Sequence, residues 1–287
     1  MAVVDAVGGD SGGPARPASL ADDAAALARA SHVGHDRAVK LLLESGVSPD
    51  AVDGEGRPAL CLAAGAGHST VVKLLFEARA AVDVADPSGA TPLLLAAARG
   101  RRETIVALLE SRADVQARGQ LLQAEGDDGV ALAPLAVACR AGHTQALGPL
   151  LEARAEVDAV DSTGATALLW AACRGAASAV PVLLAAGAAL EHSDGSGATA
   201  LLWAAAEGRL GALRALLEAR ASPHVRDDDG RTPLAWAEEH GHTDVVEALL
   251  EAGAEREAFV DEGTMEEEPL AEGSRDEVGA RPGEVLT

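Results

Sequence analysis

The sequence predicts an all-α solenoid in which seven helix-turn-helix units are stacked in a row. A short alanine-rich helical pattern ends on a glycine seven times, and successive glycines are 33 residues apart except for one spacing of 42. A pair of leucines follows each glycine in phase, which is the mark of a repeat architecture. The chain has no tyrosine, two phenylalanines and three tryptophans, so its core consists of small side chains that suit closely packed helices. The glycines are Gly34, Gly67, Gly100, Gly142, Gly175, Gly208 and Gly241.

This period divides the 287-residue chain into three parts. Residues 1–19 lack it, and we expect them to form a disordered N-terminal segment. Residues 260–287 also lack it and are rich in Glu, Gly and Pro, so we expect an acidic disordered tail. The array at 20–259 comprises the repeats 20–52, 53–85, 86–118, 128–160, 161–193, 194–226 and 227–259, with an insertion at 119–127.

The sequence of each unit predicts a turn, a helix, a tight turn, a second helix and an extended loop. In the third unit Asp86 opens the turn, Thr91 is placed to cap the first helix, and Pro92 takes the first helical position. This helix covers 93–99 and ends at Gly100, which tolerates a left-handed cap. The second helix has a buried stripe at the i, i+3, i+4 spacing, namely Ile105, Leu108 and Leu109.

Two prolines fall in second helices. Pro181 of the fifth unit is expected in a first turn, where its missing donor does not matter. Pro149 of the fourth unit follows Gly148 inside the expected helix, where a proline costs about 3 kcal/mol. We therefore expect the fourth unit to be the weakest joint of the stack.

These units resemble the ankyrin repeat over residues 20–259. The Thr-Pro-Leu segment of that family stands at Thr91 and Thr232 and is relaxed to Thr-Ala-Leu at Thr166 and Thr199, while Gly-His pairs begin at Gly34, Gly67, Gly142 and Gly241. The resemblance implies an ankyrin-repeat solenoid with protruding hairpin loops. The family commonly has a histidine after Thr-Pro-Leu that links adjacent loops. No unit has it, since that slot holds Ala28, Cys61, Leu94, Ala136, Leu169, Leu202 and Ala235. We therefore expect a weaker polar network between repeats.

The end units and the insertion depart from the pattern. Glu238 of the last unit fills a slot that holds alanine or cysteine in inner units, as expected where no further repeat covers it. The first unit is polar at Asp23 and Arg29. The insertion contains Leu121 and Leu122, so it is either a loop that contacts a partner or an addition that packs on its neighbours.

Charge and composition argue against several classes of protein. The chain has 45 acidic and 23 basic side chains, a net charge of −22, which argues against nucleic-acid binding and favours a basic protein partner. Three cysteines are too few for a disulfide framework and indicate a reducing compartment. The sequence shows neither a signal peptide nor a membrane span, so we expect a monomer in the cytoplasm, with the nucleus left open.

The residue pattern offers no catalytic constellation. Cys139 takes a core-facing slot that favours a packed thiol over a nucleophile, and His240 with His242 alone makes a poor zinc site. The glycines recur at turns and helix ends rather than in a phosphate-binding loop. We therefore expect no enzyme activity, no cofactor and no metal.

Three tryptophans provide the best functional candidate, because they take the same slot in three consecutive first helices. Positions i+3 and i+4 share their helix face and carry charged residues, so this face is expected to be half-exposed and to border a concave groove. The alternative is that the indoles stack repeat on repeat and only fill space, since Leu62, Leu95 and Val137 occupy the slot in earlier units. The predicted partner-binding residues are Trp170, Arg174, Trp203, Glu207, Asp228, Asp229, Arg231, Trp236, Glu239 and His240.

These observations predict a non-catalytic scaffold or adaptor that binds a protein partner through the groove and the loop tips. The alternative is an inhibitory or targeting subunit of an enzyme, in which the groove and the acidic tail act together. Deleting 260–287 separates the two, because an adaptor keeps its affinity while a tail-dependent inhibitor loses its function.

Overall fold

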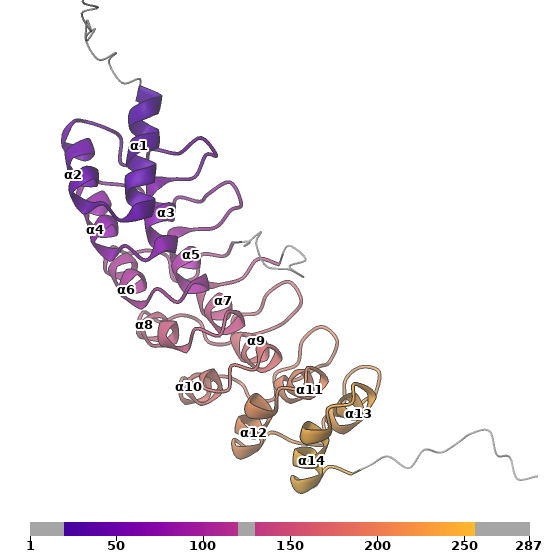
Figure 1. The fold of residues 1–287 in the computed structure, drawn as a ribbon. Helices are drawn as coiled ribbons and strands as arrows, with labels where there is room; N and C mark the ends of the chain where they lie inside the picture. The colour runs from indigo at the N-terminus through magenta and orange to yellow at the C-terminus, as the bar shows by residue number, and fades with distance from the viewer. Residues whose placement is uncertain (1–19, 120–129, 256–287) are drawn as a thin grey trace, which may run out of the picture. The chain divides into compact units, whose positions relative to one another are not determined.

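The computed structural model describes residues 20–119 and 130–255, and within them the chain is helical (Figure 1). The predicted N-terminal segment, the acidic tail and nearly all of the predicted insertion lie outside the described residues. The first helices of the units are α1 (Leu20–Val33), α3 (Ala59–Ala66), α5 (Pro92–Ala98), α7 (Pro134–Arg140), α9 (Ala167–Arg174), α11 (Ala200–Ala206) and α13 (Pro233–Glu239). The second helices are α2 (Asp36–Glu44), α4 (Ser69–Glu77), α6 (Arg102–Glu110), α8 (Leu147–Glu152), α10 (Ala179–Ala185), α12 (Leu210–Glu218) and α14 (Thr243–Glu251).

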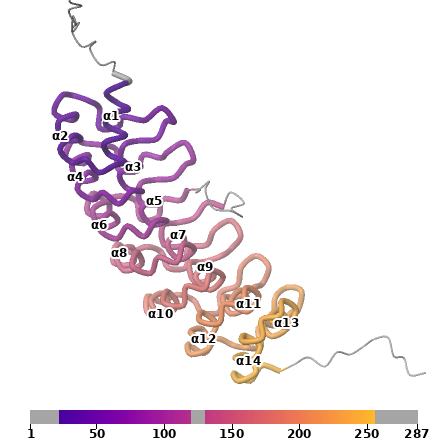
Figure 2. Tube along the Cα trace, in the orientation of Figure 1, coloured from indigo at the N-terminus to yellow at the C-terminus, as the bar shows by residue number. Residues whose placement is uncertain are grey.

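The helices form two layers. Each first helix contacts the first helix of the next unit, and most second helices do the same, so each layer follows the order of the chain. The loops between units project on the side of the first helices, away from the second helices (Figures 1 and 2). The predicted all-α solenoid is therefore confirmed in the described residues.

Local chemistry explains where the first helices begin and end. Thr91, Thr166 and Thr232 each accept a hydrogen bond from the main-chain N–H three residues on, at 3.4, 3.5 and 3.2 Å. Gly67 and Gly175 cap α3 and α9 in the left-handed region, with φ of 96° and 73°. These are the caps that the sequence pattern predicts.

Arginine replaces glycine at another left-handed position, just after the second helices. The slot holds glycine in units one, five and seven but arginine in the other four, with φ between 65° and 68°. A side chain in this conformation costs about 1–2 kcal/mol. All four side chains are exposed, so packing does not explain their presence; they are Arg79, Arg112, Arg154 and Arg220.

Small residues let neighbouring first helices approach closely. One slot on these helices is almost fully buried in five inner units, at most 1% exposed. Its occupants are Ala64, Ala97, Cys139, Ala172 and Ala205. In the last unit the same slot holds Glu238, and it is exposed. A carboxylate is thus found at the one position of this series where it retains access to water.

The second helix of the fourth unit, which contains Pro149, departs from the regular α-helix of the other units. A 3₁₀ turn, η1 (Thr144–Ala146), precedes α8, so Pro149 is the third residue of the α-helix, as Pro181 is of α10. The 3₁₀ turn occupies the position at which α4, α6, α12 and α14 begin, so the start of this second helix is 3₁₀ rather than α-helical. The structural effect of Pro149 is a shorter helix, since α8 has six residues where α4, α6, α12 and α14 have nine.

Polar links between repeats are formed by residues other than the absent histidine. One loop slot links each of the first five units to the next: Asp50, Asp83, Asp158 and Glu191 accept from a main-chain N–H 31 residues on, and Gln116 donates to the Arg154 carbonyl. A second set of links comes from the residue after the closing glycine. Its side chain donates to a main-chain carbonyl near the end of the first helix of the previous unit. His68, Arg209 and His242 form this link.

The residues that flank the insertion on either side are paired with each other. Gly119 and Leu132 form an isolated antiparallel bridge, with both main-chain N–H groups donating across it. Similar bridges close the loops of other units, at Val52 with Pro58 and at Ser193 with Thr199. The insertion therefore begins from an ordinary loop base.

Candidate functional site

Each of the three tryptophans is tied to the aspartate that opens its own unit. The indole Nε1–H donates to the aspartate Oδ2 nine residues earlier: Trp170 to Asp161 at 2.8 Å, Trp203 to Asp194 at 2.7 Å, and Trp236 to Asp227 at 2.8 Å. All three indoles are half-buried. The hydrogen bond fixes the ring at the edge of the first helix and leaves part of it open to a partner.

The same aspartates organise their loops. Oδ1 of Asp194 accepts from the main-chain N–H groups of Ser196 and Ala198 and from the Ser196 hydroxyl, while Oδ2 accepts from Trp203. Burial raises the pKa of Asp194, but these hydrogen bonds outweigh it and hold the pKa below its ordinary value. The carboxylate therefore stays ionised and connects the loop to the indole.

We expect Asp194→Asn to destabilise the array by about 2 kcal/mol at neutral pH, because an amide cannot accept at both oxygens. The folded-state pKa of Asp194 is lowered, so its contribution is present above the ordinary Asp pKa and is lost as the pH falls below about 4. Urea unfolding of the wild type and the variant at neutral and acidic pH checks this. A stability difference that persists unchanged in acid would contradict the role of the charge.

The indoles do not stack on one another in the described residues. Two of them lie beside a cation: the guanidinium carbon of Arg231 lies 3.8 Å from the Trp236 ring centroid, and that of Arg140 lies 5.7 Å from the Trp170 ring centroid. Trp170 and Trp203 also pack against the hydrophobic core. Filling space is thus part of their role, whereas stacking repeat on repeat is not.

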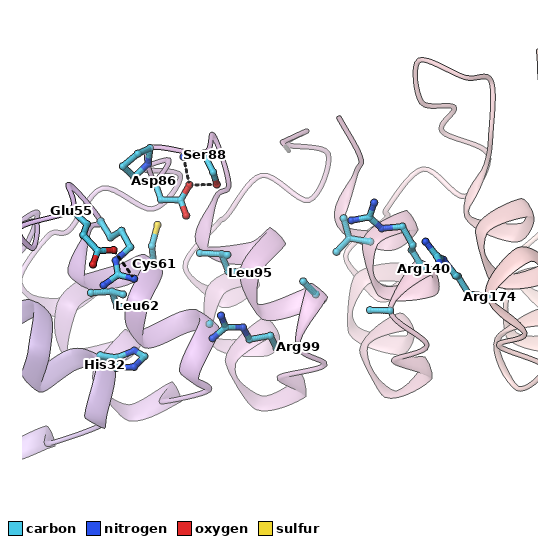
Figure 3. Close-up of a pocket in the computed structure, with 16 residues that line it drawn as sticks. His32, Glu55, Cys61, Leu62, Asp86, Ser88, Leu95, Arg99, Arg140 and Arg174 are labelled. Atoms are coloured by element: carbon cyan, nitrogen blue, oxygen red, sulfur yellow. Dashed lines mark hydrogen bonds and ion pairs between the residues drawn. The ribbon is translucent and has the colours of Figure 1, made fainter. Parts of the chain in front are cut away.

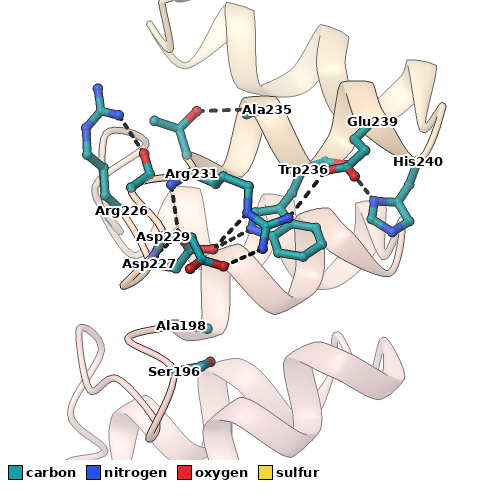
Figure 4. A network of polar contacts seen from close by, with 12 residues as sticks. Ser196, Ala198, Arg226, Asp227, Asp229, Arg231, Ala235, Trp236, Glu239 and His240 are labelled. Carbon is teal, nitrogen blue, oxygen red and sulfur yellow. Dashed lines mark hydrogen bonds and ion pairs between the residues drawn. The ribbon is translucent and has the colours of Figure 1, made fainter.

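The last unit collects five of the predicted residues in one cluster (Figure 4). Arg231 lies over Trp236 and forms ion pairs with Asp229 at 2.8 Å and Glu239 at 3.5 Å. His240 stacks on Trp236 with ring centroids 5.3 Å apart, and its Nδ1 lies 2.9 Å from the Trp236 carbonyl oxygen. The guanidinium is neutralised by its neighbours, so the surface combines an aromatic plane with acidic edges.

Other predicted residues lie outside this cluster. Glu207 pairs with Arg209 at 3.5 Å. Asp228 is exposed, and its main-chain N–H donates to the Ser196 carbonyl of the preceding loop at 3.0 Å. Arg174, at the end of α9, faces a cavity shared with earlier units rather than the tryptophans of later ones.

That cavity has a volume of about 680 Å³ and lies along the first helices of the second to fifth units (Figure 3). We call it the arginine groove and define it by Leu62, Leu95, Arg99, Arg140 and Arg174. Sequence reasoning found only Arg174 among these. The available signal was that Leu62 and Leu95 share the slot of the tryptophans, so the same face continues into the first half of the array.

The thiols and histidines show no arrangement suited to catalysis within the described residues. Burial raises the pKa of Cys61 and of Cys139 to about 12, so both thiols stay protonated at neutral pH. The Cys61 thiol, in the slot that follows the Thr-Pro-Leu position, donates to the Val84 carbonyl at 3.3 Å. No metal-binding group of three or more His, Cys, Asp or Glu is found in the described part of the chain.

The described helices include none with the length and apolar character needed to cross a bilayer.

Comparison with known proteins places this geometry in a family. The sequence model described as ankyrin repeats (3 copies) matches residues 27–119 and 179–259. The crystal structure of the human ASB11 ankyrin repeat domain is similar, with a TM-score of 0.69 and 27% sequence identity, over 80% of this chain and 99% of that one. No curated protein matches the chain. The matched residues cover more than half of the sequence and the fold agrees, so the chain belongs to the ankyrin repeat family.

Proposed function

We propose that this protein is a non-catalytic scaffold or adaptor that binds a protein partner through the concave groove and loop tips of its last three repeats. The ankyrin repeat fold commonly mediates protein–protein interaction. The observation that carries the proposal is the set of three half-exposed tryptophans, each fixed by an aspartate of its own unit.

Fixed aromatic side chains favour binding for a physical reason. Tryptophan contributes a large apolar area and is enriched among the residues that dominate interface energies. A ring that is already held in place loses little conformational entropy when a partner covers it. Around these rings Asp228, Asp229 and Glu239 are exposed, so a basic segment with apolar anchors fits this surface best.

The test replaces Trp170, Trp203 and Trp236 together with leucine. Proteins retained from native lysate by the full-length chain are compared with those retained by the variant, at low and at high salt, by mass spectrometry. We expect the fold to persist, with an unchanged circular dichroism spectrum, and the salt-resistant partner to be lost or reduced roughly tenfold or more, because each indole is a candidate hot spot.

Two further variants sharpen the result. Leu41→Ala, on an exposed side chain of α2, is the matched control and should retain the partner. Deletion of 260–287 should also retain it, whereas loss of function on deletion would favour the inhibitory or targeting subunit. Unchanged affinity of the leucine variant for the native partner would reject the assignment of the surface.

A further inference from the structure

The middle one of the three tryptophans differs from the other two in what lies over its ring. The guanidinium carbon of Arg140 lies 5.7 Å from the ring centroid of Trp170, and that of Arg231 lies 3.8 Å from the ring centroid of Trp236. No described residue places a cation over Trp203 in this way, although its ring is half-buried like the other two. The chain thus supplies a guanidinium to the two outer rings and none to the middle one.

The repeat positions explain this difference. Arg140 reaches the tryptophan of the following unit, and its slot in the next repeat holds Cys173. Arg231 reaches the tryptophan of its own unit, and its slot one repeat earlier holds Ala198, which Figure 4 labels in the preceding loop. Both routes that bring a cation to an outer ring therefore end, at Trp203, in a short side chain that is not basic.

A carboxylate without a partner lies beside the loop of the same unit. A Cβ atom at Gly197 would lie 2.5 Å from Oδ1 of Asp228, so this side chain lies against the loop that leads into α11. The Asp228 carboxylate is exposed and forms no hydrogen bond or ion pair within the described residues. Its slot one repeat earlier, against the loop of Trp170, holds Gly195, and no described unit follows that of Trp236. An unpaired acidic side chain and a missing cation thus coincide at the middle tryptophan.

The other charges of this region leave the surroundings of the ring negative. The carboxylate of Asp194 accepts from the indole of this unit at 2.7 Å and forms no ion pair within the described residues. Glu207 and Arg209 pair with each other at 3.5 Å, so these two charges offset each other. Arg174, at the end of α9, faces the arginine groove of the earlier units instead. An anionic group of a partner would be repelled by Asp194 and Asp228, whereas a cationic group would be attracted by both.

We propose that the ring of Trp203 binds a cationic side chain of the protein partner, an arginine or a lysine, with the carboxylate of Asp228 beside the bound cation. The inference rests on the proposed function and adds the position at which the basic segment is anchored. The chain's own arginines over the two outer rings are a precedent for a guanidinium on this face of the repeat. A cation is attracted to the face of an indole by the quadrupole of the ring, and the attraction grows when an interface excludes water.

The test starts from peptides that need the tryptophans. Peptides from a random display library are selected on the full-length wild-type chain, and those that also bind the variant with Trp170, Trp203 and Trp236 replaced by leucine are discarded. We expect the remaining peptides to share an arginine or a lysine next to apolar residues. Replacing this cation with glutamine in a labelled peptide should weaken its binding to the wild type at least about fivefold, measured by fluorescence anisotropy.

The decisive variant supplies the cation from within the chain. Ala198→Arg introduces the residue type that the same slot holds in two other units, where Arg57 and Arg231 each pair with the aspartate four residues earlier. The new side chain should pair with Asp194 in the same way and lie over Trp203. We expect the cationic peptide to bind this variant at least about fivefold more weakly than the wild type, and the cationic and glutamine peptides to bind it within about twofold of each other.

Further variants separate this effect from changes in folding or in total charge. Cys173→Arg brings the cation by the other route and should equalise the two peptides as well. Leu41→Arg adds the same charge at an exposed position of α2, and the cationic peptide should bind it within about twofold of the wild type. Trp236→Leu should weaken both peptides but preserve the difference between them, whereas Trp203→Leu should remove that difference.

Four results would overturn the inference. Tryptophan-dependent peptides that share no cation would reject it and leave the proposed function intact. A difference between the two peptides that persists in both Ala198→Arg and Trp203→Leu would place the cation of the partner elsewhere on the array. An equal loss of binding in Leu41→Arg would reduce the effect to general attraction between charges. A selection that yields no tryptophan-dependent peptide would reject the inference together with the proposed function.

Discussion

Ala172→Glu should divide the array into two blocks that unfold separately. Ala172 lies on α9 with 0% of its surface exposed, in the slot where inner first helices meet. A glutamate there adds an overpacked side chain and an unpaired buried carboxylate, which together cost on the order of 4 kcal/mol. In a repeat array each unit contacts only its neighbours, so a lost interface uncouples the two sides.

Urea unfolding followed by circular dichroism should show two transitions for this variant. Because burial raises the pKa of an introduced carboxyl, lowering the pH should protonate it in the folded state and recover part of the lost stability. The matched control is Glu238→Ala, which reverses the residue types in the same slot of the last unit, where the side chain is exposed. It should change stability by less than about 1 kcal/mol. A single transition with an unchanged midpoint for Ala172→Glu would contradict the assigned packing.

Leu168→Ala should lower stability by about 3 kcal/mol without dividing the array. Leu168 is also on α9 and fully buried, and removing its side chain leaves a cavity that the surrounding helices only partly fill. The interface slot at Ala172 remains intact, so unfolding should stay a single transition with a lower midpoint. The two substitutions, four residues apart on one helix, thus separate loss of core packing from loss of coupling between repeats.

The control for the cavity is Leu250→Ala, at a side chain that is 38% exposed on α14. This change should cost less than about 1 kcal/mol, because little apolar area is transferred to water. Equal destabilisation by Leu168→Ala and Leu250→Ala would show that burial does not determine stability in this array.

The sequence predicted those features that depend on local residue order. The period predicted the positions of the helices. Thr91 and Gly67 predicted a helix start and a helix end, because each end of a helix depends on residues within one turn of it. The repeat period alone does not predict the helix around Pro149, because a fixed period places the start of every second helix at the same position. The chain instead begins α8 later, which a fixed period does not anticipate.

Side-chain partners were harder to predict. The nine-residue spacing between Asp227 and Trp236 recurs in three units and was a usable signal, but nothing in the spacing states that the two side chains meet. The arginine groove combines Arg99 and Arg174, which precede a closing glycine, with Arg140, which stands one position earlier. These residues share a surface because the repeats are stacked. They do not occupy one position of the repeat, so the period does not reveal that they lie together.

The links between loops affect how such an array tolerates rearrangement. In four of these five links a main-chain N–H of the next unit donates to the carboxylate, as Ala81 does to Asp50 and Ser222 does to Glu191. Every residue except proline supplies that group. A repeat that is duplicated, lost or exchanged by recombination therefore finds its partner in whichever neighbour it meets. The exposed residues of each unit are free to diverge toward new targets while the joints of the stack are preserved.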